Sequence, residues 1–171
     1  MSRELKHASH LPVLKAIYSF MPFKNVLEFG CGNYSTKFFA EVCERLISIE
    51  NKDINWYNKI KNEIKEAEFI FKHGIEAIQI FERDAVIYDL IFIDGINRQE
   101  CNNASFGRSP IIVVHDLSPR GAEAYLKDVV KNKNYELVLM NGEYPATGIF
   151  TSNKELIKQL STIKGFIKYN W

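Results

Sequence analysis

The chain has 171 residues and carries 22 Lys and Arg against 21 Asp and Glu, so its formal net charge is +1 at pH 7. Charged residues make up 25% and hydrophobic residues 46% of the sequence, which excludes a disordered or collagen-like chain. A balanced charge without a basic block argues against a nucleic-acid partner. The length suits one domain, residues 1–171, with a helical segment over residues 1–22.

No apolar run reaches the roughly 18 residues that a membrane span needs, and no signal peptide is readable. We therefore expect a cytoplasmic protein with no membrane partner. The cysteines Cys31, Cys43 and Cys101 are scattered without the spacing of a zinc site, which predicts free thiols.

Seven short apolar runs predict seven strands. Most are continuous rather than alternating and rich in Ile, Val and Phe, which is typical of strands buried on both faces of a parallel sheet. They cover residues 25–29, 45–49, 68–72, 88–93, 110–115, 135–140 and 147–151.

Between these runs the apolar residues recur with a helical period, including helices predicted over residues 98–105, 122–131 and 153–163. Alternating helices and strands predict a doubly wound α/β sheet. Only residues 141–146 separate the sixth and seventh strands, too few for a helical crossover. The predicted fold is therefore a mostly parallel seven-stranded sheet that ends in an antiparallel hairpin.

The strongest local motif is EFGCGNYST, residues 28–36, directly after the first predicted strand. Gly30 and Gly32 allow a tight turn and a close backbone approach to a ligand. The N-terminus of the following helix offers free N–H groups. An ordinary structural turn remains the alternative.

Glu50, at the end of the second predicted strand, stands where an acid can hold the two hydroxyls of a ribose. Ser35 occupies the place of the third Gly of a dinucleotide-binding loop. The acid Glu28 would repel a pyrophosphate but suits an ammonium group. These features favour S-adenosylmethionine over NAD as the cofactor.

In these motifs the chain resembles the class I S-adenosylmethionine-dependent methyltransferases, and among them a compact subgroup with a GxGxxST loop and a VxHD fifth strand. The family's seven-stranded sheet ends in the same hairpin. The matching segments are residues 10–14, 26–36, 47–57, 88–100 and 111–117.

The resemblance implies that the glycine loop lines the methionine moiety and the ribose, and that Glu28 reaches the amino group directly or through water. It places adenine near residues 72–74 and the reactive centre near Asp94. The implied cofactor-binding residues are Glu28, Gly30, Gly32, Ser35, Glu50, His73, Gly74 and Asp94.

Asp94, His115 and Asp116 stand at the carboxyl ends of the fourth and fifth predicted strands, where ligands of doubly wound sheets gather. We interpret them as candidate catalytic residues that orient an acceptor and take its proton. Two alternatives stay open. His115 can be a buried ring bonded to loop backbone, and Asp116 a helix cap or part of a turn before Pro119.

The catechol type of these enzymes holds magnesium with two such acids and an Asn. Here Leu117 stands in the place of the Asn, so we predict no metal site, since two carboxylates alone make a poor one. The predicted function is methyl transfer to an oxygen or nitrogen of a small-molecule acceptor. One alternative is a non-catalytic S-adenosylmethionine-binding or regulatory protein. Another is an aminopropyl transferase, which is less favoured because the proteins of that family are longer than this chain.

The chain carries no inserted cap, so the first 20 residues or a second subunit would have to supply a wall of the acceptor pocket. Phe166, Tyr169 and Trp171 make the C-terminal segment aromatic. They are expected to pack on the sheet or a helix, or to contact another subunit of a homodimer.

Overall fold

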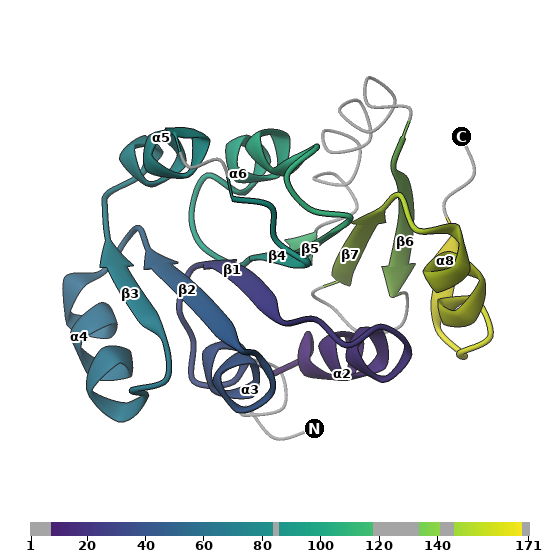
Figure 1. Ribbon diagram of the computed structural model, residues 1–171, viewed down its shortest axis with the longest axis horizontal. Coiled ribbons are helices and arrows are strands. Elements are labelled where there is room, and N and C mark those ends of the chain that lie inside the picture. Colours follow the sequence, from purple (N-terminus) through teal and green to yellow (C-terminus); the bar gives the residue numbers. More distant parts are fainter. Residues whose placement is uncertain (1–7, 84–85, 118–133, 141–145, 169–171) are drawn as a thin grey trace.

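The computed structural model describes residues 8–83, 86–117, 134–140 and 146–168, and it is built on one sheet of eight strands (Figure 1). The strand order is β3-β2-β1-β4-β5-β7-β6-β8. The strands are β1 (Asn25–Phe29), β2 (Arg45–Glu50), β3 (Glu68–Phe71), β4 (Leu90–Ile93), β5 (Ile111–Leu117), β6 (Glu136–Met140), β7 (Ala146–Thr151) and β8 (Phe166–Lys168).

The first five strands are mutually parallel, and β7 runs antiparallel between β5 and β6. The predicted mostly parallel sheet and its closing hairpin are thus confirmed. The loop of the hairpin, residues 141–145, lies outside the described residues.

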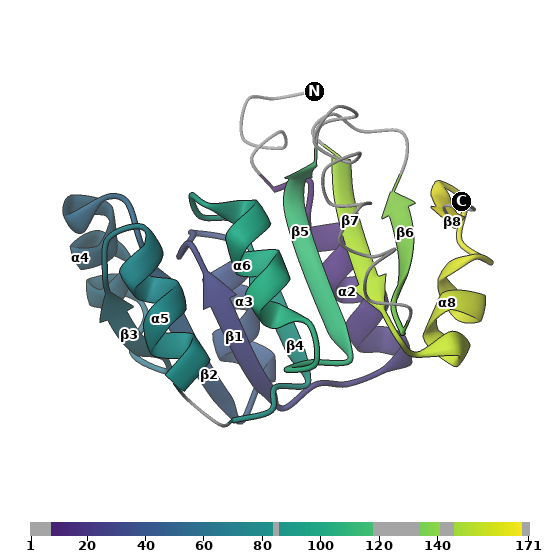
Figure 2. The same cartoon turned by 90° about the horizontal axis from the view of Figure 1, so that it is seen from above.

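Helices cover both faces of the sheet (Figure 2). Side chains of α5 and α6 pack on one face, and those of α2, α3 and α8 pack on the other. The described helices are α2 (Leu11–Phe20), α3 (Ser35–Val42), α4 (Ile54–Glu63), α5 (Ile75–Arg83), α6 (Arg98–Ser105) and α8 (Lys154–Leu160).

The apolar runs of the strands are continuous because helices cover both faces of the sheet. In β1, Leu27 and Phe29 point toward α5 and α6, whereas Val26 points toward α2 and α3, because successive side chains of a strand face opposite ways. Each fully buried side chain of this kind contributes about 1.5–3 kcal/mol. The helices do not cover the carboxyl ends of the parallel strands, where loops follow the strands.

The prediction of seven strands missed one, β8, which pairs antiparallel with β6. It has three residues, follows Gly165 at a φ of 103°, and buries only Phe166. Such a segment has no apolar run or alternation to mark it. Phe166 packs on the core as expected, while Tyr169 and Trp171 lie outside the described residues.

The helix predicted over residues 122–131 also lies outside the described residues. The last helix ends at Leu160, earlier than predicted, and turns lead from it to β8. No helix in the described ranges is both long and apolar enough to cross a membrane.

Candidate functional site

A cavity of about 700 Å³ opens at the carboxyl ends of β1, β2 and β4. Its wall comes from the loops after these three strands, the first turns of the helices that follow, and the residue that precedes α2. The lining residues are His10, Gly30, Cys31, Gly32, Asn33, Tyr34, Ser35, Glu50, Lys52, Asp53, Trp56, Asp94, Gly95, Ile96 and Arg98.

The glycine loop packs backbone against backbone on the loop after β4. Gly30 has a φ of 91°, and a Cβ on it would lie 2.5 Å from the backbone N of Gly95. The N–H of Asp94 donates to the carbonyl of Phe29 at 2.7 Å, which joins the same two loops. Only glycine fits at position 30. Gly30 thereby allows the two loops that line this part of the cavity to pack closely.

Glu28 lies beneath the loop rather than in the cavity wall. It has no exposed surface, and its Oε2 accepts hydrogen bonds of 2.6 Å from the hydroxyls of Thr36 and Ser48. Thr36 Oγ1 in turn accepts from the N–H of Gly32 at 2.8 Å. In this arrangement Glu28 supports the loop from below and does not line the cavity, so its contact with an amino group, directly or through water, stays a prediction.

Burial raises the pKa of Glu28 to about 7, and the hydroxyls of Ser35, Ser48 and Thr36 oppose that rise. Its second oxygen, Oε1, has no hydrogen-bond partner among the described residues. The carboxyl group therefore binds a proton at higher pH than an exposed glutamate does.

Glu50, which was predicted to hold the ribose hydroxyls, lines the cavity. The backbone N–H groups of Lys52 and Asp53 donate to its Oε1 at 2.9 and 3.1 Å, which fixes the carboxylate. Within the described part of the chain, its Oε2 accepts only a weak bond from Cys31 Sγ at 3.5 Å. One oxygen of a held carboxylate thus remains for a ligand.

Two residues that build this region, Asn51 and Trp56, were not predicted from the sequence. Asn51 is fully buried and bonds both the N–H and the carbonyl of Ile96, tying the loop after β2 to the loop after β4. Trp56 lines the cavity and donates to the carbonyl of Cys31 at 2.6 Å. Asn51 could have been noticed as a polar residue directly after a buried strand. Nothing in the sequence marked Trp56.

His73 and Gly74 stand outside the cavity wall. The His73 ring is exposed and packs on Phe71 with ring centroids 4.8 Å apart. The N–H of Gly74 donates to the carbonyl of Asn51 at 3.1 Å. Gly74 is therefore joined to the site through Asn51, and neither residue lines the cavity.

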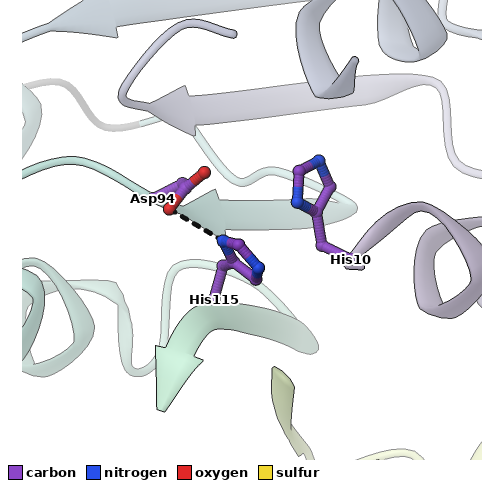
Figure 3. Close-up of side chains that lie close together, drawn as sticks. All are labelled: His10, Asp94 and His115. Carbon is purple, nitrogen blue, oxygen red and sulfur yellow. Dashed lines mark hydrogen bonds and ion pairs between the residues drawn. The ribbon is translucent and has the colours of Figure 1, made fainter. Parts of the chain in front are cut away.

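The three predicted catalytic residues do come together. His115 Nδ1 lies 3.0 Å from Asp94 Oδ1 and 3.7 Å from Asp116 Oδ1 (Figure 3 shows the first pair). Adjacent residues of a regular strand would face opposite ways, but the register of β5 shifts between Val114 and Leu117, and Asp116 has a φ of 57°. This bulge turns His115 and Asp116 toward the same edge.

Arg98, in the first turn of α6, bridges the two carboxylates. Its NH2 group lies 3.0 Å from Asp94 Oδ1 and 3.0 Å from Asp116 Oδ2. A cation therefore stands between the two acids that the sequence analysis considered, and rejected, as magnesium ligands. Asp116 serves here as an ion-pair partner; the helix it was also considered to cap lies outside the described residues.

The pKa of Asp94 is lowered. Burial alone would raise it, but the hydrogen bond and charge of His115, together with His10 and Arg98, outweigh the burial. Asp94 is therefore ionised at neutral pH and accepts the Nδ1–H of His115. Its other oxygen, Oδ2, has no hydrogen-bond partner among the described residues.

Both ring nitrogens of His115 are engaged, because Nε2 forms a hydrogen bond of 2.9 Å with Ser9 Oγ. The ring is 5% exposed. Its partners are two side chains rather than the loop backbone weighed as an alternative. His115 therefore orients Asp94 and anchors the segment before α2.

His10, like Arg98, lies at this edge and was not assigned to the site from the sequence. It lines the cavity from the N-cap position of α2, so the N-terminal segment supplies part of the wall. Its ring packs edge-on against His115 with centroids 4.6 Å apart. Burial lowers its pKa to about 4, helped by His115 and opposed by Asp94, so the imidazole is neutral at pH 7.

No family model matches the chain, and no curated protein matches it in sequence. Solved structures do match. A Staphylococcus aureus protein provisionally named a caffeoyl-CoA O-methyltransferase aligns over 85% of this chain and 83% of its own, with a TM-score of 0.68 and 16% identity. The amino pentose methyltransferase CalS10 from Micromonospora echinaspora covers 86% of this chain and 92% of its own, with a TM-score of 0.65 and 10% identity.

The N-methyltransferase NodS from Bradyrhizobium japonicum covers 88% of this chain and 97% of its own, with a TM-score of 0.63 and 17% identity. The chain thus has the fold of class I S-adenosylmethionine-dependent methyltransferases, as the resemblance predicted. At these identities the likeness establishes the fold and leaves the chemistry to the residues of the site.

Proposed function

We propose that this protein binds S-adenosylmethionine and transfers its methyl group to an oxygen or nitrogen of a small molecule. The observation that carries the proposal is that one cavity joins the glycine loop, Glu50 and Asp94, three elements assigned to the cofactor from sequence alone. In support, NodS has been solved with S-adenosylhomocysteine and CalS10 with S-adenosylmethionine.

The cofactor would lie across the loops with its ribose at Glu50. The two N–H groups on Oε1 hold that carboxylate in place, and charge-assisted hydrogen bonds from ribose hydroxyls are strong. Trp56 and Ile96 offer apolar surface in the same wall for the adenine. His73 and Gly74, which the resemblance assigned to the adenine, do not line the cavity, and Gly74 would act on the adenine side through its hydrogen bond to Asn51.

The methionine end would lie between the glycine loop and Asp94. Asp94 is ionised and has one free oxygen, so it replaces Glu28 as the group best placed for the ammonium or for the acceptor's proton. His115 and Arg98 hold Asp94 by its other oxygen, and Asp116 holds Arg98. Methyl transfer is an in-line displacement in which the protein mainly positions the reactants.

The test has two parts. Calorimetry should show S-adenosylmethionine or S-adenosylhomocysteine binding with micromolar affinity, about −8 kcal/mol, and no comparable binding of NAD. Transfer from labelled cofactor across a panel of small hydroxyl and amine acceptors should then give a product. Tight binding without transfer to any acceptor would favour the non-catalytic binding protein, and tighter binding of NAD would refute both readings.

A further inference from the structure

Three side chains that can ligate a metal converge from three separate segments at the edge of the cavity. His10 stands at the start of α2, Asp94 follows β4, and His115 belongs to β5 (Figure 3). One ligand atom from each lies within 4.8 Å of the other two. Two imidazoles and one carboxylate with an open side form a recurrent set of ligands for catalytic metal ions.

His10 supplies an independent reason to expect a ligand. Its ring is 3% exposed, yet neither ring nitrogen has a hydrogen-bond partner among the described residues. Buried polar groups in folded proteins are nearly always bonded, because leaving one unsatisfied costs free energy. The ring lies in the cavity wall beside Asp94 and His115, so the partner it lacks belongs in the space between them.

The other two ligands already stand at the right separation. Two atoms that each lie about 2.1 Å from one ion at a right angle are about 3.0 Å apart, and His115 Nδ1 lies 3.0 Å from Asp94 Oδ1. An ion would take the place of the proton now shared by these two atoms.

The surroundings of His115 and Asp94 fit a bound ion as well. With Nδ1 on a metal, His115 carries its proton on Nε2, and Ser9 Oγ at 2.9 Å can accept it. Ligating histidines usually make such a second bond. Arg98 also bonds Asp94 Oδ1 and helps to hold the carboxylate, whose second oxygen, Oδ2, has no hydrogen-bond partner among the described residues.

The geometry points to a site for one divalent transition-metal ion held by His10, Asp94 and His115. Imidazole favours zinc, iron, cobalt or nickel, whereas magnesium prefers an all-oxygen set. The site differs from the pair Asp94 and Asp116, whose shared space holds the Arg98 guanidinium. In the proposed reaction, such an ion would add positive charge at the rim of the cavity and lower the pKa of an acceptor hydroxyl.

The experiment uses the full chain, freed of metal by chelation and without cofactor, titrated with Zn²⁺, Co²⁺ and Mg²⁺ in a calorimeter. We expect one saturable site for Zn²⁺ and Co²⁺ with a dissociation constant near or below about 1 µM, and none for Mg²⁺. Co²⁺ should also develop a visible absorption spectrum of a nitrogen-ligated ion.

Each of the variants His10→Ala, Asp94→Asn and His115→Ala should weaken Co²⁺ binding at least tenfold. His73→Ala is the matched control, because His73 is exposed and lies outside the cluster; it should bind as the parent does. Asp94→Asn keeps the shape of a partly exposed side chain, so it remains informative if a buried histidine variant fails to fold.

Absence of saturable binding below about 1 mM Zn²⁺ or Co²⁺ would overturn the inference. So would binding that survives unchanged in both His10→Ala and Asp94→Asn, or Mg²⁺ binding as tightly as Co²⁺. The same metal-free sample is titrated with S-adenosylhomocysteine. Cofactor binding without metal binding would refute the metal site alone, and metal binding without cofactor binding would refute the proposed function alone.

Discussion

The Thr36 hydroxyl donates to the Glu28 carboxylate at 2.6 Å and accepts from the N–H of Gly32 at 2.8 Å. The loop that faces the cavity is thus fastened from below by a side chain that never reaches the cavity surface. Loop geometry and cofactor affinity should therefore depend on Thr36 even though no ligand touches it.

Replacing Thr36 with Val keeps the shape of the side chain but removes this relay. It leaves Glu28 and the Gly32 N–H each short of a partner, so we expect a loss of about 1–3 kcal/mol in the free energy of unfolding. Cofactor affinity should fall as well. Denaturant unfolding and calorimetry measure the two effects, and Thr36→Ser, which keeps the hydroxyl, is the control. A loss in Thr36→Ser as large as that in Thr36→Val would contradict a specific role of the hydroxyl.

Gly30→Ala should be more damaging than the same change at another glycine of positive φ. A Cβ at position 30 would lie 2.5 Å from Gly95 N, whereas a Cβ at Gly107, with a φ of 78°, would meet nothing within 4 Å. Gly107→Ala thus reports the backbone strain alone, about 1–2 kcal/mol. Gly30→Ala should cost clearly more and abolish cofactor binding. Similar unfolding free energies for the two variants would contradict the close packing of the two loops.

Glu28 should make the protein less stable as the pH rises from about 4.5 to about 7. Its pKa is 4.5 in the ordinary state and about 7 when folded, so in this window the folded state binds more protons than the unfolded state, and unfolding releases them. The stabilisation is present in full below pH 4.5 and is lost as the pH passes the folded pKa; its size is on the order of 3 kcal/mol.

His10 acts in the opposite direction, since its pKa falls from 6.5 to about 4 on folding and its contribution grows over that range. The measurement is therefore the difference between the parent and Glu28→Gln, followed by denaturant unfolding at pH 5 and pH 8 in the presence of a chelator. The advantage of the parent over Glu28→Gln should shrink toward pH 8. A difference independent of pH would show that Glu28 titrates normally.

Glu50→Gln should weaken cofactor binding by about 2–3 kcal/mol, because a neutral amide replaces a charge-assisted acceptor for the ribose hydroxyls. The fold should survive, since the Gln carbonyl can still accept from the N–H groups of Lys52 and Asp53. Glu44→Gln serves as the control, because that carboxylate is exposed and pairs only with Lys24. Unchanged affinity in Glu50→Gln would refute the ribose assignment.

His115→Ala and Asp116→Asn should each lower kcat by about 10²–10⁴ while leaving cofactor affinity nearly unchanged. Neither residue lines the cavity, and both act through Asp94 or Arg98. Asp94→Asn should impair turnover and cofactor affinity together. Single-turnover transfer and calorimetry on the same samples separate the two effects, and full activity in a His115/Asp116 double variant would refute their role.

Much of the fold could be predicted, because strands buried on both faces appear as short continuous apolar runs and the glycine loop appears as a local motif. Gly30, Glu50 and Asp94 were found for the same reason: each stands at the end of a recognisable strand. β8 was not predicted because its three residues carry no strand pattern of their own, and the strand is defined by its pairing with β6.

The site was predicted less completely, because its remaining members depend on contacts between distant segments. His10 could not be assigned to the site from the sequence, because its role depends on the contact with His115 that the position of α2 creates. Asn51 bonds Ile96 in the loop after β4, and Arg98 bonds Asp116 near the end of β5. The bulge that turns Asp116 toward the edge is a property of the pairing between β5 and β7, which no local pattern expresses.

The two outermost strands limit how copies of this protein can associate. β3 has four residues and begins with an exposed Glu68; β8 has three, and its Lys168 is paired with Glu136 of β6. Short, charged border strands offer few backbone groups to a second sheet and discourage aggregation by sheet extension. Contacts through helices or loops are therefore the favoured route to a dimer, and they would leave the sheet at the same number of strands.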